Sequence, residues 1–467
     1  MVGKVSGGRS RGWPVRAVVL VLAGGMIAAW GSVRAAPPTL GCEEPPDHAP
    51  VASFPVDEAR QQLSTLAREV LARSAEVQGA QHAGRAARFD LAQTAAAGQP
   101  AIGLNAGLGL AQAEQDGDTR REARTGSLGL NVSAPLYDGG RLSELVRYRQ
   151  RMAEVGELGV GSVQERVVRD AVLTALERRR HTVQLAVHDR YVGKMACLVR
   201  QMEQVVELDR GRSSELLQAR KGLRQAQLAR EDTLAAQRQS AQRLQLLLGG
   251  TAILPWHLVG LPLQEVPPLA QVIDDITASP EVQQMRLQAE AMDAYARASR
   301  ADLAPQVRWQ VGTSQSRQSH LDVRQWNAGL TLSLVLADGG AAAAAGNAAA
   351  ERALAARRQQ DALVDDRARS AAALHDTVLS ARQRAAQIVD VLRESEQVRA
   401  ATYEQWARLG RRSLFDLMAA ESDHVQLRLA EVNAQHDAWA AVAQLRSVGA
   451  GLLPWLVPEL APVAGMR

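Results

Sequence analysis

Aromatic side chains are scarce in this chain of 467 residues: they make up 3% of the sequence, and phenylalanine occurs three times. Large globular cores depend on bulky apolar side chains, so this scarcity argues against the two or three compact domains that the length would otherwise suggest. Alanine, leucine, arginine, glutamine and glutamate are abundant instead. These residues favour long helices that pack closely through alanine and leucine. The composition therefore predicts an elongated, mainly helical protein.

Cysteine is also rare, with Cys42 and Cys197 as its two occurrences. Their spacing supports no metal site. Cys42 follows a Thr-Leu-Gly sequence that resembles a lipoprotein signal, but Thr39 stands where such a signal has an apolar residue, and lipidation is the minor alternative. A disulfide between the two cysteines would join a Pro-rich segment to the middle of a helix. Two unrelated thiols are therefore the favoured interpretation.

The residue patterns of an enzyme or of a cofactor-binding protein are missing as well. The nine histidines are scattered without metal-ligand spacing, and the glycine turns are not followed by the Lys-Ser/Thr pair of a phosphate-binding loop. His181 and His188 lie two turns apart on an expected helix and are interpreted as surface residues. No catalytic residue, cofactor or metal ligand is predicted, and we expect that the protein is not an enzyme.

Charge is not concentrated in any one segment. The formal net charge is +4, and arginines alternate with glutamate and glutamine along the expected helices, without aromatic clusters. A nucleic-acid surface needs a concentrated basic patch. The charges are therefore assigned to solvated helix faces, and no nucleic-acid partner is predicted.

The N-terminus has the three regions of a secretory signal peptide. Several arginines precede an apolar run at 17–30, which is too short to cross a bilayer, and small residues at 33–35 form a cleavage pattern. Cleavage is expected after about residue 35 or 36, with an N-terminal membrane anchor as the alternative. The mature chain is thus expected to leave the cytoplasm.

One stretch of the sequence occurs twice. Ser127–Gly140 reads SLGLNVSAPLYDGG, and 200 positions later Asn327–Gly340 reads NAGLTLSLVLADGG. In both, apolar residues alternate with small polar residues over about ten positions, the length and pattern of a tilted transmembrane β-strand with a wet interior. A half-buried strand of a soluble sheet shows the same alternation. The elements around the two copies have to decide between these interpretations.

Those surrounding elements are duplicated too. In each copy a helix ends before a proline, Pro100 or Pro305, and an alternating strand and a polar loop complete a hairpin. Two long helices follow each Asp-Gly-Gly turn and are interrupted near Gly211 or Gly410. The predicted organisation is a signal peptide at 1–36, a first repeat at 37–250 (β-hairpin 101–137, helical hairpin 140–248), a linker at 251–275, a second repeat at 276–452 (β-hairpin 305–337, helical hairpin 340–450) and a C-terminal tail at 453–467.

Four strands are too few for a closed barrel in a membrane, where the smallest barrels have eight. Open sheet edges would leave backbone polar groups without partners in lipid. Three copies of the chain would supply twelve strands and pair every edge, and all the long helices would leave the barrel at the Asp-Gly-Gly turns. A soluble coiled-coil protein with β-hairpins at one end is the alternative.

The duplicated unit of strand, Asp-Gly-Gly turn and long helix resembles the TolC family of outer-membrane channel proteins over nearly all of the mature chain. The family's Pro-Leu-(Phe/Tyr)-Asp-Gly-Gly pattern is present at 135–140 and, in degraded form, at 335–340. The resemblance implies a mainly α fold with membrane β-strands, in which a homotrimer forms a 12-strand β-barrel in the outer membrane and an α-helical barrel across the periplasm. It marks the following residues as barrel-to-tunnel turns: Asp138, Gly139, Gly140, Asp338, Gly339 and Gly340.

The turn at the periplasmic tip of each helical hairpin is the second feature of the family. Its pattern of glycine, basic residue, Ser or Thr and Asp is matched in the second repeat by Gly410, Arg412, Ser413 and Asp416, and the first repeat offers Gly211, Ser213 or Ser214, and Glu215. In the family these turns dock the adaptor and form the closed aperture, and Arg412 and Glu215 are the candidates for links that close it. Solvated turn charges are the alternative. A frequent tyrosine and a further aspartate are Ala407 and Ala419 here, which puts the usual latch and the full acidic ring in doubt.

The resemblance implies a passive exit duct of a tripartite export system. Its partners are a periplasmic adaptor, an inner-membrane ABC transporter and the lipid of the outer membrane. The missing lipoprotein signal favours type I secretion of a protein, and the Arg- and Ala-rich character suits family members that export an adenylate cyclase-haemolysin toxin. Efflux of small molecules is one alternative, and a periplasmic coiled-coil structural protein is another.

Overall fold

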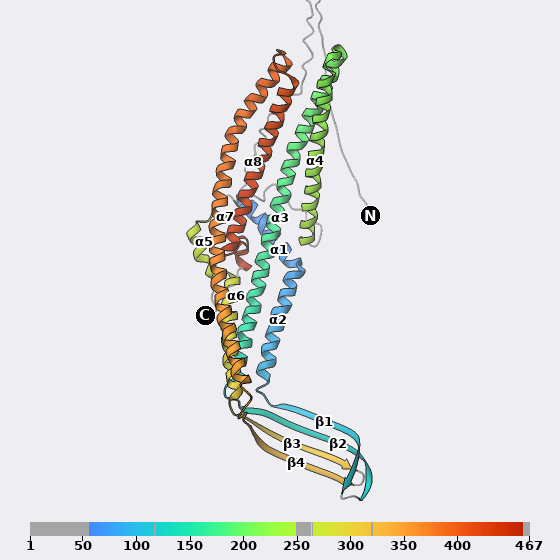
Figure 1. Ribbon diagram of the computed structural model, residues 1–467, viewed down its shortest axis with the longest axis vertical. Helices are drawn as coiled ribbons and strands as arrows, with labels where there is room; N and C mark the ends of the chain where they lie inside the picture. Colours follow the sequence, from blue (N-terminus) through green and yellow to red (C-terminus); the bar gives the residue numbers. More distant parts are fainter. Residues whose placement is uncertain (1–55, 116–117, 249–262, 264, 319–320, 461–467) are drawn as a thin grey trace, which may run out of the picture. The chain divides into compact units, whose positions relative to one another are not determined.

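The structure is a computed structural model that describes residues 56–460 except for 116–117, 249–262, 264 and 319–320. The expected signal peptide, Cys42 and the last seven residues of the expected tail lie outside the described residues. Helices make up most of the described chain (Figure 1). They are α1 (Val56–Arg73), α2 (Ala75–Ala96), α3 (Arg141–Leu208), α4 (Ser213–Leu248), α5 (Leu269–Asp275), α6 (Pro280–Arg300), α7 (Ala341–Ala407), α8 (Leu414–Val448) and α9 (Leu452–Leu456), with short 3₁₀ turns η1 (Arg210–Arg212), η4 (Ile276–Ala278), η5 (Ala301–Leu303) and η6 (Pro458–Leu460).

Four antiparallel strands form one sheet in the order β1-β2-β3-β4. They are β1 (Ala101–Gln115), β2 (Asp118–Tyr137), β3 (Gln306–Gln318) and β4 (Leu321–Ser333). The two hairpins are far apart in the sequence, and pairing between β2 and β3, such as Val132 opposite Val311, joins them into one sheet. β1 and β4 are therefore the edges of the sheet.

The last strand is shorter than the sequence predicts. The alternation continues to Leu336, but β4 ends at Ser333. Ser333 pairs with Gln306, the first residue of β3, so the residues after Ser333 have no neighbouring strand to pair with. β2 continues to Tyr137 because Val307 still lies opposite it.

Two helices run through the whole helical region, and the others pack along them in pairs (Figure 1). α3 has 68 residues, which correspond to about 100 Å at 1.5 Å per residue. It contacts α2 and α6 near its start and α4 and α8 farther along. α7 contacts α6 and then α8 in the same way. Within the described residues, every helix is too short or too polar to cross a membrane.

Small residues allow these helices to approach closely. A β-carbon on Gly84 of α2 would lie 3.3 Å from the carbonyl oxygen of Gly156 in α3. On α6 the buried residues are mostly alanines, among them Ala291 and Ala294, and α7 buries Ala349 and others in turn. The abundance of alanine thus reflects close helix packing, as the composition predicts.

The largest apolar core lies where α1, α3, α4, α8 and α9 meet. It contains Leu63, Val172, Leu244, Val442 and Leu453, all at most 3% exposed. The C-terminal tail expected from residue 453 therefore begins within this core, because the apolar sequence of α9 packs against α1 and α3.

Cys197 lies in α3 and is disulfide-bonded. Among the described residues there is no free cysteine. The expectation of two unrelated thiols is therefore wrong for Cys197. Sequence reasoning rejected a disulfide in the middle of a helix, although a helical cysteine can reach a partner in a neighbouring segment.

The two Asp-Gly-Gly turns join strand to helix by the same hydrogen bonds. Asp138 accepts from the backbone nitrogens of Gly140 (3.0 Å) and Leu142 (2.6 Å), and Asp338 accepts from those of Gly340 (2.9 Å) and Ala342 (2.7 Å). Each aspartate thus satisfies amides at the helix N-terminus, where the helix dipole favours a negative charge. Both glycines of each turn have positive φ, between 69° and 89°.

The first turn is fixed against the second repeat, whereas the second turn is open within the chain. A β-carbon on Gly139 would lie 2.1 Å from that of Ala304, and Arg141 forms an ion pair with Asp302. A β-carbon on Gly339 would meet nothing within 4 Å. The same sequence motif therefore has two different environments in one chain.

We expect Gly139→Ala to destabilise the protein more than Gly140→Ala does. Both substitutions place alanine at positive φ, which costs roughly 1–2 kcal/mol. Gly139→Ala adds a clash with Ala304, whereas the nearest side-chain atom to a β-carbon on Gly140 is 3.7 Å away. Thermal unfolding of the detergent-purified variants, followed by helical circular dichroism, measures the difference. Equal midpoints would contradict the contact between this turn and Ala304.

Candidate functional site

One face of the sheet is lined with small, uncharged polar side chains. Asn105 donates to Asn131 at 3.1 Å, and both line a shallow hollow with Ser133, Gln310 and Asn327. Glycines alternate with these residues along the strands. Apart from Arg308, the described side chains of this face are uncharged, and the face is open and suited to contact with water.

The opposite face carries large apolar side chains that nothing in the chain covers. The leucines of β1 and β4 are the clearest cases, with Leu104 and Leu330 both 70% exposed and Leu108 95% exposed. Trp326, in the middle of β4, is 79% exposed. Exposed apolar area of this extent marks a membrane or partner surface rather than a surface in water.

The turn between α3 and α4 contains three of the predicted tip residues. Asp209 accepts from the backbone nitrogen of Gly211 at 3.0 Å and starts the 3₁₀ turn η1. Arg212 binds both oxygens of Glu215, at 3.1 and 2.7 Å, and this hydrogen bonding raises the pKa of Arg212. Gly211 and Ser214 are exposed. The carboxylate of Glu215 is thus already paired within its own turn.

The turn between α7 and α8 contains the other four. Gly410 has a φ of 61°, the left-handed conformation that glycine adopts readily. Ser413 and Asp416 form a capping box at the start of α8, in which each side chain accepts from the other's backbone nitrogen. The hydrogen bond from the Ser413 backbone holds the pKa of Asp416 below its usual value. Arg412 is exposed and donates to the side chain of Gln405 at 3.2 Å.

The structure does not bring the two predicted linking residues together within one chain. Glu215 pairs with Arg212, and Arg412 contacts Gln405 and lies close enough to Asp416 to lower its pKa. Of the two, Arg412 has the side chain that is freer to reach another molecule. Both turns are otherwise exposed, while Leu414 and Met202 just behind them are fully buried.

A buried group of charges near the tips was missed by the sequence reasoning. Glu421 of α8 is 2% exposed and lies 2.6 Å from the ammonium of Lys194 in α3 and 3.5 Å from Arg399 in α7. Burial raises the pKa of Glu421, although the two neighbouring cations act to lower it. These three side chains join three helices, so they fix how the two helical hairpins meet. The missed signal is a glutamate within the apolar stripe that contains Leu417 and Val425.

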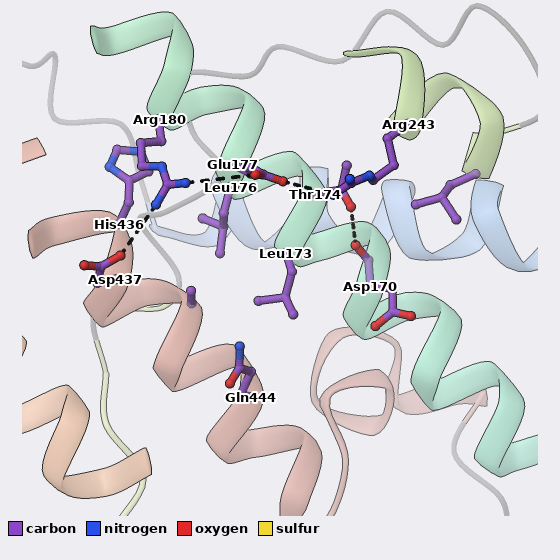
Figure 2. A pocket seen from close by; sticks show the side chains of 12 residues that line it. Asp170, Leu173, Thr174, Leu176, Glu177, Arg180, Arg243, His436, Asp437 and Gln444 are labelled. Carbon is purple, nitrogen blue, oxygen red and sulfur yellow. Dashed lines mark hydrogen bonds and ion pairs between the residues drawn. The ribbon is translucent and has the colours of Figure 1, made fainter. Parts of the chain in front are cut away.

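A cavity of about 510 Å³ lies between α3, α4 and α8 (Figure 2). Ion pairs cross it: Arg180 lies 3.6 Å from Asp437 and 4.0 Å from Glu177, and Arg243 lies 3.5 Å from Glu177. His436 donates to a backbone carbonyl in the same helix, and burial lowers its pKa to about 4. The cavity wall therefore contains arginines and carboxylates that pair with one another, and a neutral histidine.

The two histidines expected on the surface are largely covered. His188 is 8% exposed, and the side chain of His181 is 15% exposed and contacts Gln184 at 3.1 Å. They were predicted to be exposed because the sequence does not show that α3 packs against other helices on several sides. In the part of the chain that the structure describes, no group of His, Cys, Asp or Glu has the arrangement of a metal site.

Comparison with known proteins gives the fold and a family match over part of the chain. A family model for outer membrane efflux proteins matches residues 66–250, which include the first Asp-Gly-Gly turn and the first tip. No curated protein matches the sequence significantly.

Several solved structures are similar to the chain at low sequence identity. The chain is similar to a structure of CusC in a study of transmembrane channel formation (TM-score 0.75, 17% identity, 84% of this chain and 92% of that chain). It is also similar to the CmeC outer membrane channel of Campylobacter jejuni (TM-score 0.74, 13%, 87% and 90%). The open MtrE outer membrane channel of Neisseria gonorrhoeae is a third (TM-score 0.70, 16%, 84% and 90%).

These similarities confirm the predicted mainly helical, TolC-like fold with a few membrane strands. The predicted outer-membrane localisation agrees with the description of the matching family model, outer membrane efflux protein. Residues 66–250 thus match the outer membrane efflux protein family, and the chain shares the fold of the solved outer-membrane channels.

Proposed function

We propose that three copies of this chain form a passive exit duct in the outer membrane, which a periplasmic adaptor and an inner-membrane transporter engage at its tip. The observation that carries the proposal is a four-stranded sheet with one exposed apolar face, one polar face with a single described charge, and two unpaired edges. Cargo would pass along the polar face, and lipid would cover the apolar face.

The height of the apolar face fits a bilayer. Apolar residues of β1 extend from Ile102 to Leu110, which is about 27 Å along the strand and about 20 Å across the membrane at a tilt of roughly 40°. Two exposed aromatic residues lie on this face: Tyr137 is at the turn end of β2, and Trp326 is the last apolar residue of β4 before Arg324 and Asp322. Membrane barrels carry aromatic side chains at both interfaces.

The two sheet edges require a neighbouring copy. In lipid, unpaired backbone groups of β1 and β4 would each cost several kcal/mol. Pairing of β4 with β1 of the next copy removes both edges and continues the antiparallel order. Three copies give twelve strands, above the minimum of eight.

Contacts within the chain indicate how copies would meet. The first Asp-Gly-Gly turn packs against Ala304, just before β3, and Glu144 of α3 pairs with Arg297 of α6 at 2.9 Å. The second turn, at Gly339, lacks such a contact among the described residues. Because the chain is duplicated, the segment before β1 in the next copy is the equivalent partner. A periplasmic coiled-coil structural protein, the alternative, would leave the apolar sheet face in water.

We expect the detergent-purified protein to crosslink as a trimer and to conduct ions in planar bilayers. Ala328→Arg, on the apolar face, should reduce the trimer in the outer membrane, because a lipid-facing arginine costs about 2–4 kcal/mol near the bilayer centre. The adjacent Asn327→Arg is the control, since it lies on the polar face and should still assemble. A soluble monomer, or absence of conductance, would refute the duct.

At the periplasmic end, we propose that the two tip turns form the closed aperture and the docking surface for the adaptor. Exposure of Gly211, Ser214, Gly410, Ser413 and Asp416 supports a docking role. For the link between copies, Arg412 is favoured over Glu215. Glu215 already has a bidentate partner, whereas Arg412 contacts a neutral glutamine.

Arg412→Ala should raise the conductance of the isolated channel, because it removes the cation proposed to hold neighbouring tips together. Arg411→Ala is the matched control: Arg411 is the exposed neighbour, and no ion pair to it is found within the described residues. Single-channel recordings measure both variants. If Arg412→Ala stays as closed as the unmodified channel, Arg412 does not latch the tip.

Two classes of cargo are considered for the duct, small molecules and a secreted protein, and they differ in their support. The description of the family as efflux proteins supports export of small molecules. Type I secretion of a protein toxin stays a prediction from the sequence, which rests on Thr39 in place of the apolar residue of a lipoprotein signal.

Deletion of the gene should increase sensitivity to dyes and detergents and leave the secreted proteins unchanged, since a lost efflux duct retains small toxic molecules. Growth inhibition assays and a comparison of culture media measure the two effects. Loss of one protein from the medium, with unchanged sensitivity, would instead establish secretion of a protein. Restoration by the intact gene controls for effects on neighbouring genes.

A further inference from the structure

The polar face of the sheet carries a single charged side chain among the residues whose side chains the structure describes. Side chains of β3 alternate between the faces, and Arg308 shares its face with Gln310, Gly312 and Ser314. The polar-face residues of the other three strands are Gly, Ala, Ser, Thr, Asn, Gln, Pro and Val. Arg308 is therefore unlike every other described position on this face.

Register places Arg308 next to the Asp-Gly-Gly turns. It pairs with Pro135 of β2 and with Thr331 of β4, both within a few residues of the ends of their strands. Figure 1 shows that the sheet gives way to the long helices at these strand ends, which in the proposed trimer would be the inner mouth of the barrel.

Nothing among the described residues neutralises Arg308. It is exposed, and no carboxylate forms an ion pair with it. The nearest turn aspartates, Asp138 and Asp338, are occupied by backbone amides. The edge strand β1, which the next copy would contribute, has Ala101 and Gly103 on the same face at this level. A neighbouring copy would therefore bring no described countercharge through β1.

We propose that Arg308 forms a ring of three positive charges at the inner mouth of the barrel, which makes this section of the duct favour anions and anionic groups of the cargo. The inference rests on the proposed trimeric duct. It concerns a specificity-determining residue, because the rest of the described polar face does not distinguish charge.

The dimensions allow such a ring to act across the bore. Twelve strands about 4.8 Å apart and tilted by roughly 40° enclose a barrel with a radius of about 12 Å. An extended arginine covers roughly half of that distance. The remaining gap is shorter than the Debye length of about 8–10 Å at 0.1–0.15 M salt and longer than the value of about 3 Å at 1 M. The charge is thus felt at the axis at physiological ionic strength and screened at high salt.

The test is the ion selectivity of the reconstituted channel, measured as the chloride-to-potassium permeability ratio near 0.1 M salt. Arg308→Gln should lower the ratio at least about twofold, and Arg308→Glu should lower it further, with both differences lost near 1 M salt. Arg308→Lys should retain the ratio, because it keeps the charge. Arg324→Gln, which removes a cation from the opposite face of the sheet, should leave it unchanged.

A second measurement localises the effect to the barrel. Inorganic triphosphate added on the side of the sheet should reduce the current of the unmodified channel and lose this effect in Arg308→Gln. A channel that conducts, but whose permeability ratio and triphosphate block are the same in Arg308→Glu, would overturn the role of Arg308 and leave the duct intact. Absence of conductance in the unmodified protein would instead refute the duct.

Discussion

Pairing of β2 with β3 is the interaction on which the rest of the structure depends. These backbone hydrogen bonds unite two hairpins that are about 180 residues apart in the sequence, and they place the two repeats side by side. The outer edges of β1 and β4 have no partner strand within the chain. In water, solvent would satisfy those edges, but the exposed leucines beside them require lipid, where solvent is absent. Sheet pairing and sheet hydrophobicity together are therefore the basis for the proposed assembly of further copies of the chain.

The Asp-Gly-Gly turn explains how a membrane strand continues directly into a helix of nearly seventy residues. Its aspartate accepts from amides that the helix would otherwise leave unpaired, and its glycines supply two consecutive positive φ values. The turn thus changes direction and caps the helix without a separate loop. Duplication of this unit accounts for most of the architecture, since each repeat adds one hairpin to the sheet and one pair of long helices to the bundle.

Strands and turns that show a short repeating pattern or a motif could be predicted from the sequence. Features that depend on contacts with a distant segment of the chain could not. Alternation and the Asp-Gly-Gly motif gave the strands, the joints and the fold class. The end of β4 at Ser333 depends on where β3 begins, and the burial of Glu421 depends on Lys194 more than two hundred residues away. The disulfide at Cys197 and the buried position of α9 likewise depend on segments that are distant in sequence. The predicted tip residues lie in the two turns at the ends of the helical hairpins.

The composition of the polar face has a consequence for how such a duct can be selective. Small uncharged side chains and glycines leave a wide bore, because they extend little from the strands. A bore this wide has few contacts with its cargo and so cannot recognise shape there. Charge acts over several ångströms without contact, which makes it the interaction able to discriminate in a bore of this width. A single unpaired arginine on each chain, placed where barrel meets helices, is then enough to give the membrane section a preference that the other described residues of that face do not supply.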